Sequence, residues 1–291
     1  MKSIIAISVF SLILSSLSAQ ENWDPKINSK LSEVLVRHKE FVSIPNLPAD
    51  KQKMYENIDW VKNRYEKVGF QLKKLESSTL PVLFAQRILD PTFKTVLFYF
   101  HLDGQAVNPK MWNQKNPFHP MLKEQKEDGD WRAIPWSSLK GEINDDWRIF
   151  GRAAADDKAP IIMFLSALEL LQKQHQNPKF NIKIIFDLEE EYSSQGFLST
   201  LKKYKEVYRS DYMIIMDGPA HNSNQPTLTF GCRGIATCSI TTYGSKLPQH
   251  SGHYGNYLPN PALALSKVLA SMKDDQGRVV IPGFYDGILL D

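Results

Sequence analysis

Three short apolar runs, each about the length of one strand, are followed directly by residues of the types that commonly bind metals. They are TVLFYF (95–100) before His101 and Asp103, IKIIF (182–186) before the acidic run 187–191, and YMIIM (212–216) before Asp217. Runs of about four to eight β-branched and aromatic residues are typical of buried strands. The sequence therefore predicts a sheet that carries its polar groups at the ends of its strands.

Helical periodicity separates these runs. Apolar residues recur at steps of three and four over 54–68 and 159–171, and an earlier helix with the same spacing begins near Ile27. Strands that alternate with helices indicate an α/β fold with a largely parallel sheet and flanking helices. The segment 104–150 has no clear period but contains four tryptophans, so we expect an ordered loop over a site.

A chain of 291 residues has room for about two domains. Hydrophobic residues make up 42% and charged residues 23%, as in globular proteins with a sizeable core. From residue 227 the stretch TLTFGCRGIATCSITTYG alternates like sheet strands, and an amphipathic helix over 262–272 follows. We therefore expect a first domain over 27–225 and the start of a second, α+β domain over 226–291, with Cys232 and Cys238 as buried, unpaired thiols.

The charge balance gives no reason to expect a nucleic acid partner. The chain has 35 basic and 32 acidic residues, for a formal net charge of +3. It contains no dense run of Lys or Arg that would favour binding to phosphates.

The N-terminus resembles a secretory signal. Lys2 precedes an apolar run from Ile4 to Leu14, and Ser16-Leu17-Ser18 offers small residues at the spacing of a cleavage site. The alternative is a membrane anchor, but the run is shorter than the roughly 20 residues of a span and no basic cluster follows it. We expect cleavage of residues 1–18 and an exported protein, periplasmic or extracellular, without membrane association after removal of the signal.

The strand ends predict a metal centre. In open α/β sheets, ligands bind outside the carboxyl ends of the strands, where His101, the acidic run and Asp217 would converge. Asp156 and Asp157 directly precede the helix over 159–171 and could join them. One imidazole and several carboxylates fit zinc or a similar divalent ion. Their number suggests two ions that share a bridging carboxylate, with one glutamate left as general base.

Each of these features has an alternative interpretation. A histidine at a strand end can be a hydrogen-bonded structural residue. The acidic run 187–191 can serve as a favourable N-terminus for the helix that follows, and Asp156 and Asp157 can cap theirs. The metal hypothesis rests on their coincidence, because all of them fall at the same end of the predicted sheet.

In these residues the sequence resembles the di-zinc metallopeptidase family of aminoacylases, carnosinase-like dipeptidases and carboxypeptidase G. The matching segments are FHLD (100–103), FGRAAADDKAP (150–160), LEEEYSSQGF (188–197), DYMIIMDGP (211–219), GCRG (231–234) and HSGHYGNYLPNP (250–261). They occur in the order and near the spacings of the family. The resemblance implies that 27–225 is the N-terminal part of a catalytic metallopeptidase domain. It implies that 226–291 is an incomplete dimerisation or lid domain.

The resemblance also implies the ligands of two zinc ions per site, with other divalent ions as alternatives. His101 and Asp217 correspond to ligands of the first metal, and Glu191 to a ligand of the second. Asp156 corresponds to the carboxylate that bridges both. Asp103 corresponds to the residue that orients the imidazole of His101, which agrees with its place two residues further along an extended chain.

Three further residues receive roles from the resemblance. Glu190 corresponds to the general base that takes a proton from the metal-bridging water. His250 corresponds to the lid-domain histidine that reaches the substrate, across the dimer interface in dimeric members, and Arg233 lies in a family motif near it. The sequence departs from the family at Ala153, where a glycine is usual, and at Asn256, where a second glycine is common. A third departure is Ala159, also in place of glycine.

The implied activity is that of an exported zinc-dependent hydrolase of dipeptidase type. It would cleave the amide bond of dipeptides or small peptides as a homodimer joined through the lid domain. The alternative enzyme is an N-acyl-amino-acid deacylase of the same family. In this family the catalytic domain resumes after the lid and supplies the last histidine ligand of the second metal, whereas the sequence stops inside the lid. A catalytically incomplete fragment that acts at most as a metal-binding module is therefore a third alternative.

The ligand count predicts a metal stoichiometry for this chain. His101, Asp156 and Asp217 give the first zinc the three protein ligands that are usual in catalytic sites, whereas Asp156 and Glu191 give the second only two. We expect purified residues 19–291 to bind about one zinc per chain, measured by elemental analysis after dialysis. Two tightly bound zinc ions would mean that another residue of this chain supplies a ligand.

Overall fold

The computed structural model describes residues 23–218, 221–223, 225 and 227–288. The signal sequence predicted over 1–18 lies outside these residues. The chain divides between residues 220 and 221 into two compact units, which are described separately. Among the described helices, none combines the length and the apolar character that a membrane span requires.

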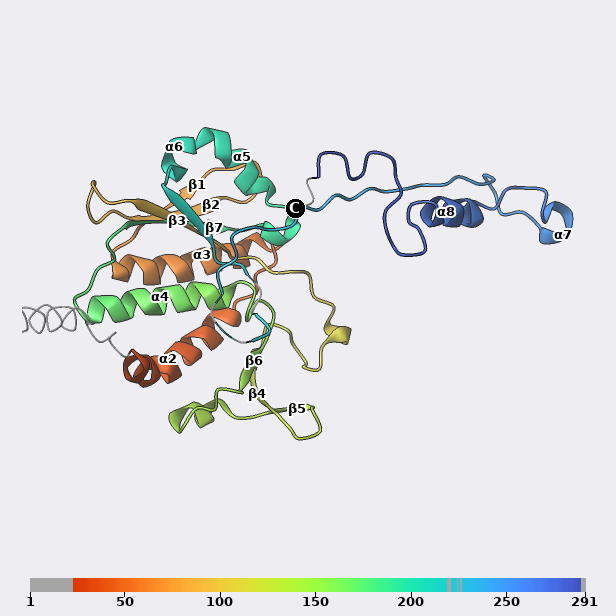
Figure 1. Cartoon of the computed structure of the whole chain (residues 1–291). Helices are drawn as coiled ribbons and strands as arrows, with labels where there is room; N and C mark the ends of the chain where they lie inside the picture. Colours follow the sequence, from red (N-terminus) through yellow and green to blue (C-terminus); the bar gives the residue numbers. More distant parts are fainter. Residues whose placement is uncertain (1–22, 219–220, 224, 226, 289–291) are drawn as a thin grey trace, which may run out of the picture. The chain divides into compact units, whose positions relative to one another are not determined.

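The first unit contains helices, strands and short 3-10 turns in an alternating order (Figure 1). The helices are α2 (Asp24–Val42), α3 (Lys51–Tyr65), α4 (Lys158–Lys173), α5 (Gln195–Lys203) and α6 (Lys205–Tyr208). The strands are β1 (Gln71–Leu75), β2 (Val82–Arg87), β3 (Thr95–His101), β4 (Met121–Gln125), β5 (Trp131–Ala133), β6 (Arg148–Phe150), β7 (Asn181–Asp187) and β8 (Tyr212–Ile215). The 3-10 turns are η1 (Glu66–Val68), η2 (Pro109–Met111), η3 (Trp136–Lys140) and η4 (Glu190–Tyr192).

The main sheet has five strands in the order β1-β2-β7-β3-β8. Its central strand β3 runs parallel to β7 and to β8, whereas β2 runs antiparallel to β7 and to β1. Parallel neighbours need a crossover, which α4 provides between β3 and β7 and α5 with α6 provide between β7 and β8. The α/β class is confirmed, and the sheet is mixed rather than largely parallel because short connections without a helix link β1, β2 and β3.

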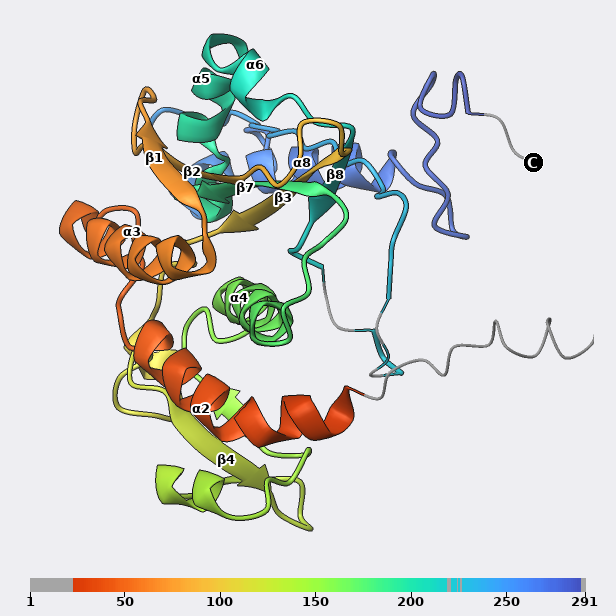
Figure 2. The same cartoon turned by 90° about the vertical axis from the view of Figure 1, so that its left-hand side faces the viewer.

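Helices cover both faces of this sheet, with α3 and α4 on one face and α5 and α6 on the other (Figures 1 and 2). Alternate residues of β3 point to opposite faces, as the pleat requires. Phe98 and Phe100 join the core under α3 and α4, whereas Leu97 and Tyr99 join the cluster under α6. The predicted helices over 54–68 and 159–171 are confirmed, and their apolar faces are buried in this core.

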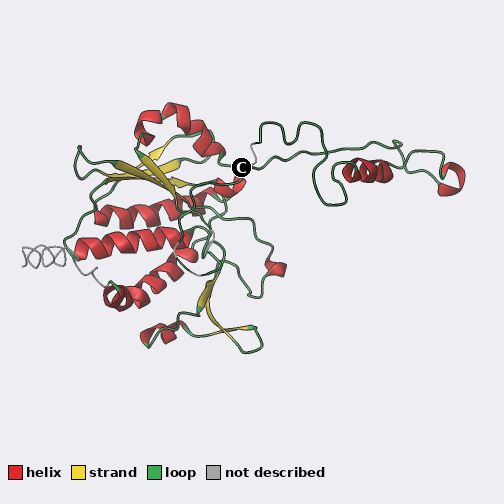
Figure 3. Ribbon diagram, viewed as in Figure 1, coloured by secondary structure: helices red, strands yellow, loops and turns green. Residues whose placement is uncertain are grey.

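The segment 104–150 is ordered, as expected, and forms a second sheet (Figure 3). This sheet has the order β5-β4-β6 and is antiparallel throughout. It packs beside α2, where the ammonium group of Lys39 lies 4.8 Å from the centre of the Trp136 ring. Its alternation is short and irregular, which explains why the sequence alone predicted only a loop.

Strand β8 differs from the buried strand that its composition predicted. The side chains from Tyr212 to Ile215 are all at least 36% exposed. The strand lies at the edge of the sheet, and no described element covers it. An apolar run therefore predicts strand formation here, but burial depends on a neighbour that the run does not encode.

The second unit, residues 221–291, contains α7 (Ser251–Tyr254) and α8 (Pro261–Ala270). Helix α8 confirms the helix predicted over 262–272. The strands expected over 227–244 are absent from the described chain, and Cys232 and Cys238 are free and exposed rather than buried. A strand requires a partner for its backbone hydrogen bonds, which the described part of this unit does not supply.

The backbone explains two of the departures from the family pattern. Ala153 has φ +59° and Asn256 has φ +59°, both in the left-handed region that favours glycine. Asn tolerates this region, whereas a buried alanine there costs about 1–2 kcal/mol. The third departure, Ala159, lies in the first turn of α4, where alanine is a good helix former.

Buried His38 of α2 predicts an acid sensitivity of the first unit. Burial lowers the pKa of His38 to about 4, against a hydrogen bond to the backbone of Ala154 that raises it. In the unfolded chain the imidazole of His38 takes up a proton near pH 6.5, whereas in the folded chain it does so only near pH 4. His38 therefore costs about 2–3 kcal/mol of stability as the pH falls from about 6.5 to 4. Urea unfolding at pH 7.5 and 4.5 should show a smaller loss for His38→Gln than for the unchanged protein; an equal loss would contradict the assignment.

Candidate metal centre

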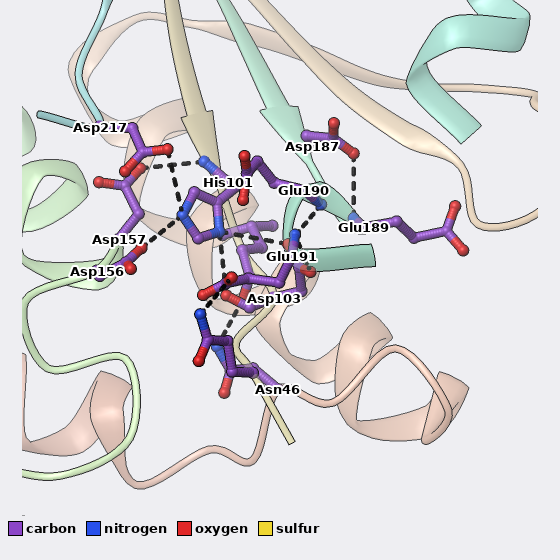
Figure 4. A network of polar contacts seen from close by, with 12 residues as sticks. Asn46, His101, Asp103, Asp156, Asp157, Asp187, Glu189, Glu190, Glu191 and Asp217 are labelled. Carbon is purple, nitrogen blue, oxygen red and sulfur yellow. Dashed lines mark hydrogen bonds and ion pairs between the residues drawn. The ribbon is translucent and has the colours of Figure 1, made fainter. Parts of the chain in front are cut away.

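The parallel register of the sheet brings three of the predicted site residues together. His101 ends β3 and pairs with Asp187 at the end of β7, and Asp217 follows the parallel strand β8. Ligand atoms of His101, Glu190 and Asp217 all lie within 4.8 Å of one another. The chain thus gathers an imidazole and two carboxylates at the carboxyl edge of the sheet (Figure 4). His101 and Asp217 were predicted as ligands, whereas Glu190 was predicted as the general base, and Glu191, the predicted ligand of the second metal, is not part of this group.

His101 is fully buried, and its two ring nitrogens have different surroundings. Nε2 lies 2.8 Å from Oδ1 of Asp156 and 3.7 Å from Oδ2 of Asp217. Nδ1 lies 3.1 Å from the carbonyl oxygen of Asp103 and 3.3 Å from its Oδ1. Asp103 therefore orients the ring so that Nε2 faces the carboxylates, the arrangement that a metal-binding histidine requires.

The electrostatics of the site favour a bound cation. Burial opposes the charged imidazolium, but the hydrogen bond to Asp103 and the charges of nearby aspartates outweigh it and raise the pKa of His101 to about 10. Burial, followed by repulsion from neighbouring carboxylates, raises the pKa of Glu190 and of Asp217, against the attraction of His101. Nitrogen and carboxylate oxygen donors without a thiolate fit zinc or a similar divalent ion.

Asp103 also organises the acidic turn that follows β7. Its carboxylate is fully buried and accepts the backbone N–H of Glu190 at Oδ1 (3.0 Å) and that of Glu191 at Oδ2 (3.1 Å). One carboxylate thus holds both the imidazole of His101 and the backbone of the two glutamates. The sequence predicted the first of these functions, but not the second, because the turn is far from Asp103 in the sequence.

The three consecutive glutamates have three different surroundings (Figure 4). The side chain of Glu190 belongs to the cluster with His101, and the carboxylate of Glu191 accepts a hydrogen bond from Nε2 of Gln105 at 2.9 Å. Glu189 points away and accepts the backbone N–H of Gly196 (3.1 Å) in the first turn of α5, as well as the hydroxyl of Thr79. The alternative interpretation, an acidic helix N-terminus, therefore holds for Glu189.

The structure separates Asp156 from Asp157 as well. Asp156 is largely exposed and faces Nε2 of His101, whereas Asp157 is buried and accepts the backbone N–H of His101 at 3.0 Å. Burial raises the pKa of Asp157 to about 8, against the attraction of His101. Asp156 thus suits a metal ligand, and Asp157 ties the start of α4 to the end of β3.

The two predicted substrate-binding residues lie in the second unit. His250 precedes α7, and its Nδ1 accepts the backbone N–H of Gly252 at 3.0 Å. Arg233 lies in an exposed segment without regular secondary structure. Because the two units are described separately, the roles of both residues stay predictions.

Comparison with known proteins agrees with the site. Residues 97–254 match the model of Peptidase family M20/M25/M40. The chain is 28% identical over 277 residues to the Cys-Gly metallodipeptidase dug1 of Schizosaccharomyces pombe, covering 90% of the chain and 54% of the relative. It is 27% identical to the Beta-Ala-His dipeptidase of Mus musculus, covering 84% of the chain and 48% of the relative. The chain thus spans about half the length of these curated relatives.

Two solved structures share the fold. Human carnosine dipeptidase 1 superimposes with a TM-score of 0.62 at 21% identity, over 93% of the chain and 56% of that structure. An M20 family metallo-carboxypeptidase from Sulfolobus solfataricus superimposes with a TM-score of 0.63 at 23% identity, over 87% of the chain and 53% of that structure.

The double contact of Asp103 predicts a loss of metal affinity when its charge is removed. Asp103→Asn replaces one acceptor oxygen by an amide that cannot accept a backbone N–H, and it weakens the support of the His101 ring. We expect zinc affinity to fall about 10–100-fold, measured by competition with a chelator. Asp128→Asn, in an exposed loop, serves as the control. Unchanged affinity in Asp103→Asn would contradict the role of Asp103.

Proposed function

The chain belongs to Peptidase family M20/M25/M40, and on this basis we propose that the protein is a zinc-dependent hydrolase that cleaves the amide bond of dipeptides or small peptides. The observation that carries the proposal is the cluster of His101, Glu190 and Asp217, whose ligand atoms lie within 4.8 Å of one another. Its buried imidazole and clustered carboxylates provide the donors that a metallopeptidase needs.

We assign one complete zinc site and two ligands of a second zinc site to this edge of the sheet. His101, Asp156 and Asp217 would hold the first, and Asp156 and Glu191 would contribute to the second, with Asp156 as the bridge. Zinc bound there would polarise the scissile carbonyl and lower the pKa of a coordinated water. Support for the bridging role comes from the exposed carboxylate of Asp156, which faces the imidazole and is free of the backbone contacts that fix Asp157.

We assign the general base to Glu190. Its side chain lies beside His101 and Asp217, and its backbone N–H is fixed by Asp103. Burial raises the pKa of this carboxylate, which strengthens it as a base toward water. Glu190 would accept the proton of the attacking water and deliver it to the leaving amine.

Dipeptides are the favoured substrates because the two curated relatives are named as dipeptidases. An N-acyl-amino-acid deacylase would use the same metal chemistry on a different acyl group. We expect kcat/KM for Cys-Gly and β-Ala-His to exceed that for N-acetyl amino acids by about 10-fold or more, the scale on which pockets distinguish such groups. The reverse order would favour the deacylase.

The resemblance of residues 1–18 to a secretory signal supports export to the periplasm or the extracellular space. N-terminal sequencing of the exported protein, which should begin near residue 19, tests this proposal. The HSG segment at 250–252 supports a homodimer through the lid domain, in which His250 and Arg233 contact the substrate. Analytical ultracentrifugation tests the dimer.

The assignment of the base predicts a separation of turnover from metal binding. Glu190→Gln keeps the shape of the side chain but cannot take the proton, so kcat should fall by at least about 10² while zinc content stays near that of the unchanged protein. Glu189→Gln is a matched control, because the side chain of Glu189 points away from the cluster, so this variant should leave kcat nearly unchanged. Normal kcat in Glu190→Gln would overturn the assignment.

A further inference from the structure

Asn46, in the connection between α2 and α3, contacts the backbone on both sides of Asp103. Its side-chain Nδ2 donates to the backbone carbonyl oxygen of Leu102 at 2.8 Å. The backbone carbonyl oxygen of Asn46 accepts the N–H of Gly104 at 3.0 Å. Asn46 is fully buried. Figure 4 shows Asp103 between Asn46 and His101. The two hydrogen bonds therefore fix the peptide groups that determine the direction of the Asp103 side chain.

The backbone of Gly104 packs closely against the side chain of Asn46. A Cβ atom on Gly104 would lie 3.1 Å from both Nδ2 and Oδ1 of Asn46. Such a distance is shorter than an ordinary van der Waals contact between these atoms, about 3.5 Å. The backbone at Gly104 thus lies directly against the amide group of Asn46, which fits a specific clamp better than a loose surface contact.

The connection that carries Asn46 is itself anchored to the start of α4. The buried ammonium group of Lys158 donates to the carbonyl oxygens of Phe41 (2.8 Å) and Ile44 (2.7 Å). Lys158 opens α4 two residues after Asp156. Hydrogen bonds therefore hold the α2–α3 connection at Ile44 to the start of α4 and at Asn46 to the residues that follow β3.

We propose that Asn46 is a positioning residue of the metal centre, which acts through Asp103 on the imidazole of His101 and on the turn at Glu190 and Glu191. The inference rests on the proposed metallopeptidase function, since it assigns Asn46 to the support of that same site. Asn46 does not ligate the metal or touch the substrate. It holds Asp103 so that its two oxygens meet the two glutamate N–H groups and the imidazole at once.

The test measures metal binding without substrate. Asn46→Ala should lower the affinity for Co²⁺ and Zn²⁺ about 10-fold, the lower end of the effect of losing a partner of a metal ligand. It should also change the visible absorption spectrum of bound Co²⁺, which reports coordination geometry. Both are compared in the full chain, together with urea unfolding of the metal-free protein.

Asn181→Ala is the matched control. Asn181 is also a buried asparagine that clamps backbone, with Nδ2 on the carbonyl of Asp90 (2.7 Å) and Oδ1 on the N–H of Leu89 (2.8 Å). It begins β7, whereas the metal centre lies at the other end of that strand. We expect Asn181→Ala to lower stability while its Co²⁺ affinity and spectrum stay unchanged.

The outcomes decide between positioning and simple stability. Equal metal affinity in Asn46→Ala and the unchanged protein, or an equal loss in Asn181→Ala, would overturn the proposal. If Asn46→Ala does not fold, Gly104→Ala displaces the amide by its Cβ, and normal Co²⁺ affinity in that variant would also overturn it. Absence of dipeptide hydrolysis by an unchanged protein that binds metal would instead count against the proposed function alone.

Discussion

The candidate metal centre depends on the hydrogen bonds that the buried carboxylate of Asp103 accepts. A buried ionised carboxylate costs much free energy unless hydrogen bonds compensate it. Asp103 obtains them from the backbone N–H groups of Glu190 and Glu191 and from Nδ1 of His101. Asp103 therefore links the end of β3 to the turn after β7, and the orientation of the imidazole depends on the position of the acidic turn.

The carboxylates at this edge of the sheet carry more negative charge than the single imidazole can neutralise. Asp156, Asp217 and Glu190 surround one imidazole, and burial and mutual repulsion raise the pKa of Glu190 and Asp217. A divalent cation would relieve this repulsion, so metal binding and the stability of this edge of the sheet are coupled. Burial raises the pKa of Glu190, which supports the role that we propose for it as the base toward water.

The topology of the sheet determines where this chemistry occurs. Two helical crossovers make β7, β3 and β8 parallel, so their polar ends meet at one edge. The helix of the first crossover, α4, begins at Lys158. Asp157 binds the backbone of His101, and Lys158 binds the carbonyl oxygen of Ile44 in the α2–α3 connection. Asn46 completes the contact from that connection. The site is thus supported from α2, from α4 and from the sheet.

The sequence by itself determined the strands β3, β7 and β8, the helices α3, α4 and α8, the α/β class and the residue types of the candidate metal centre, because periodicity and strand-end chemistry are local properties. Tertiary structure decided which of two aspartates and which of three glutamates face the imidazole, since neighbours in sequence diverge according to the backbone that each one meets. It also decided that Asn46, distant in sequence and without any motif of its own, lies against Asp103. Burial also depends on tertiary structure. The composition of β8 predicts a strand, but its apolar side chains are exposed because no described element packs on them.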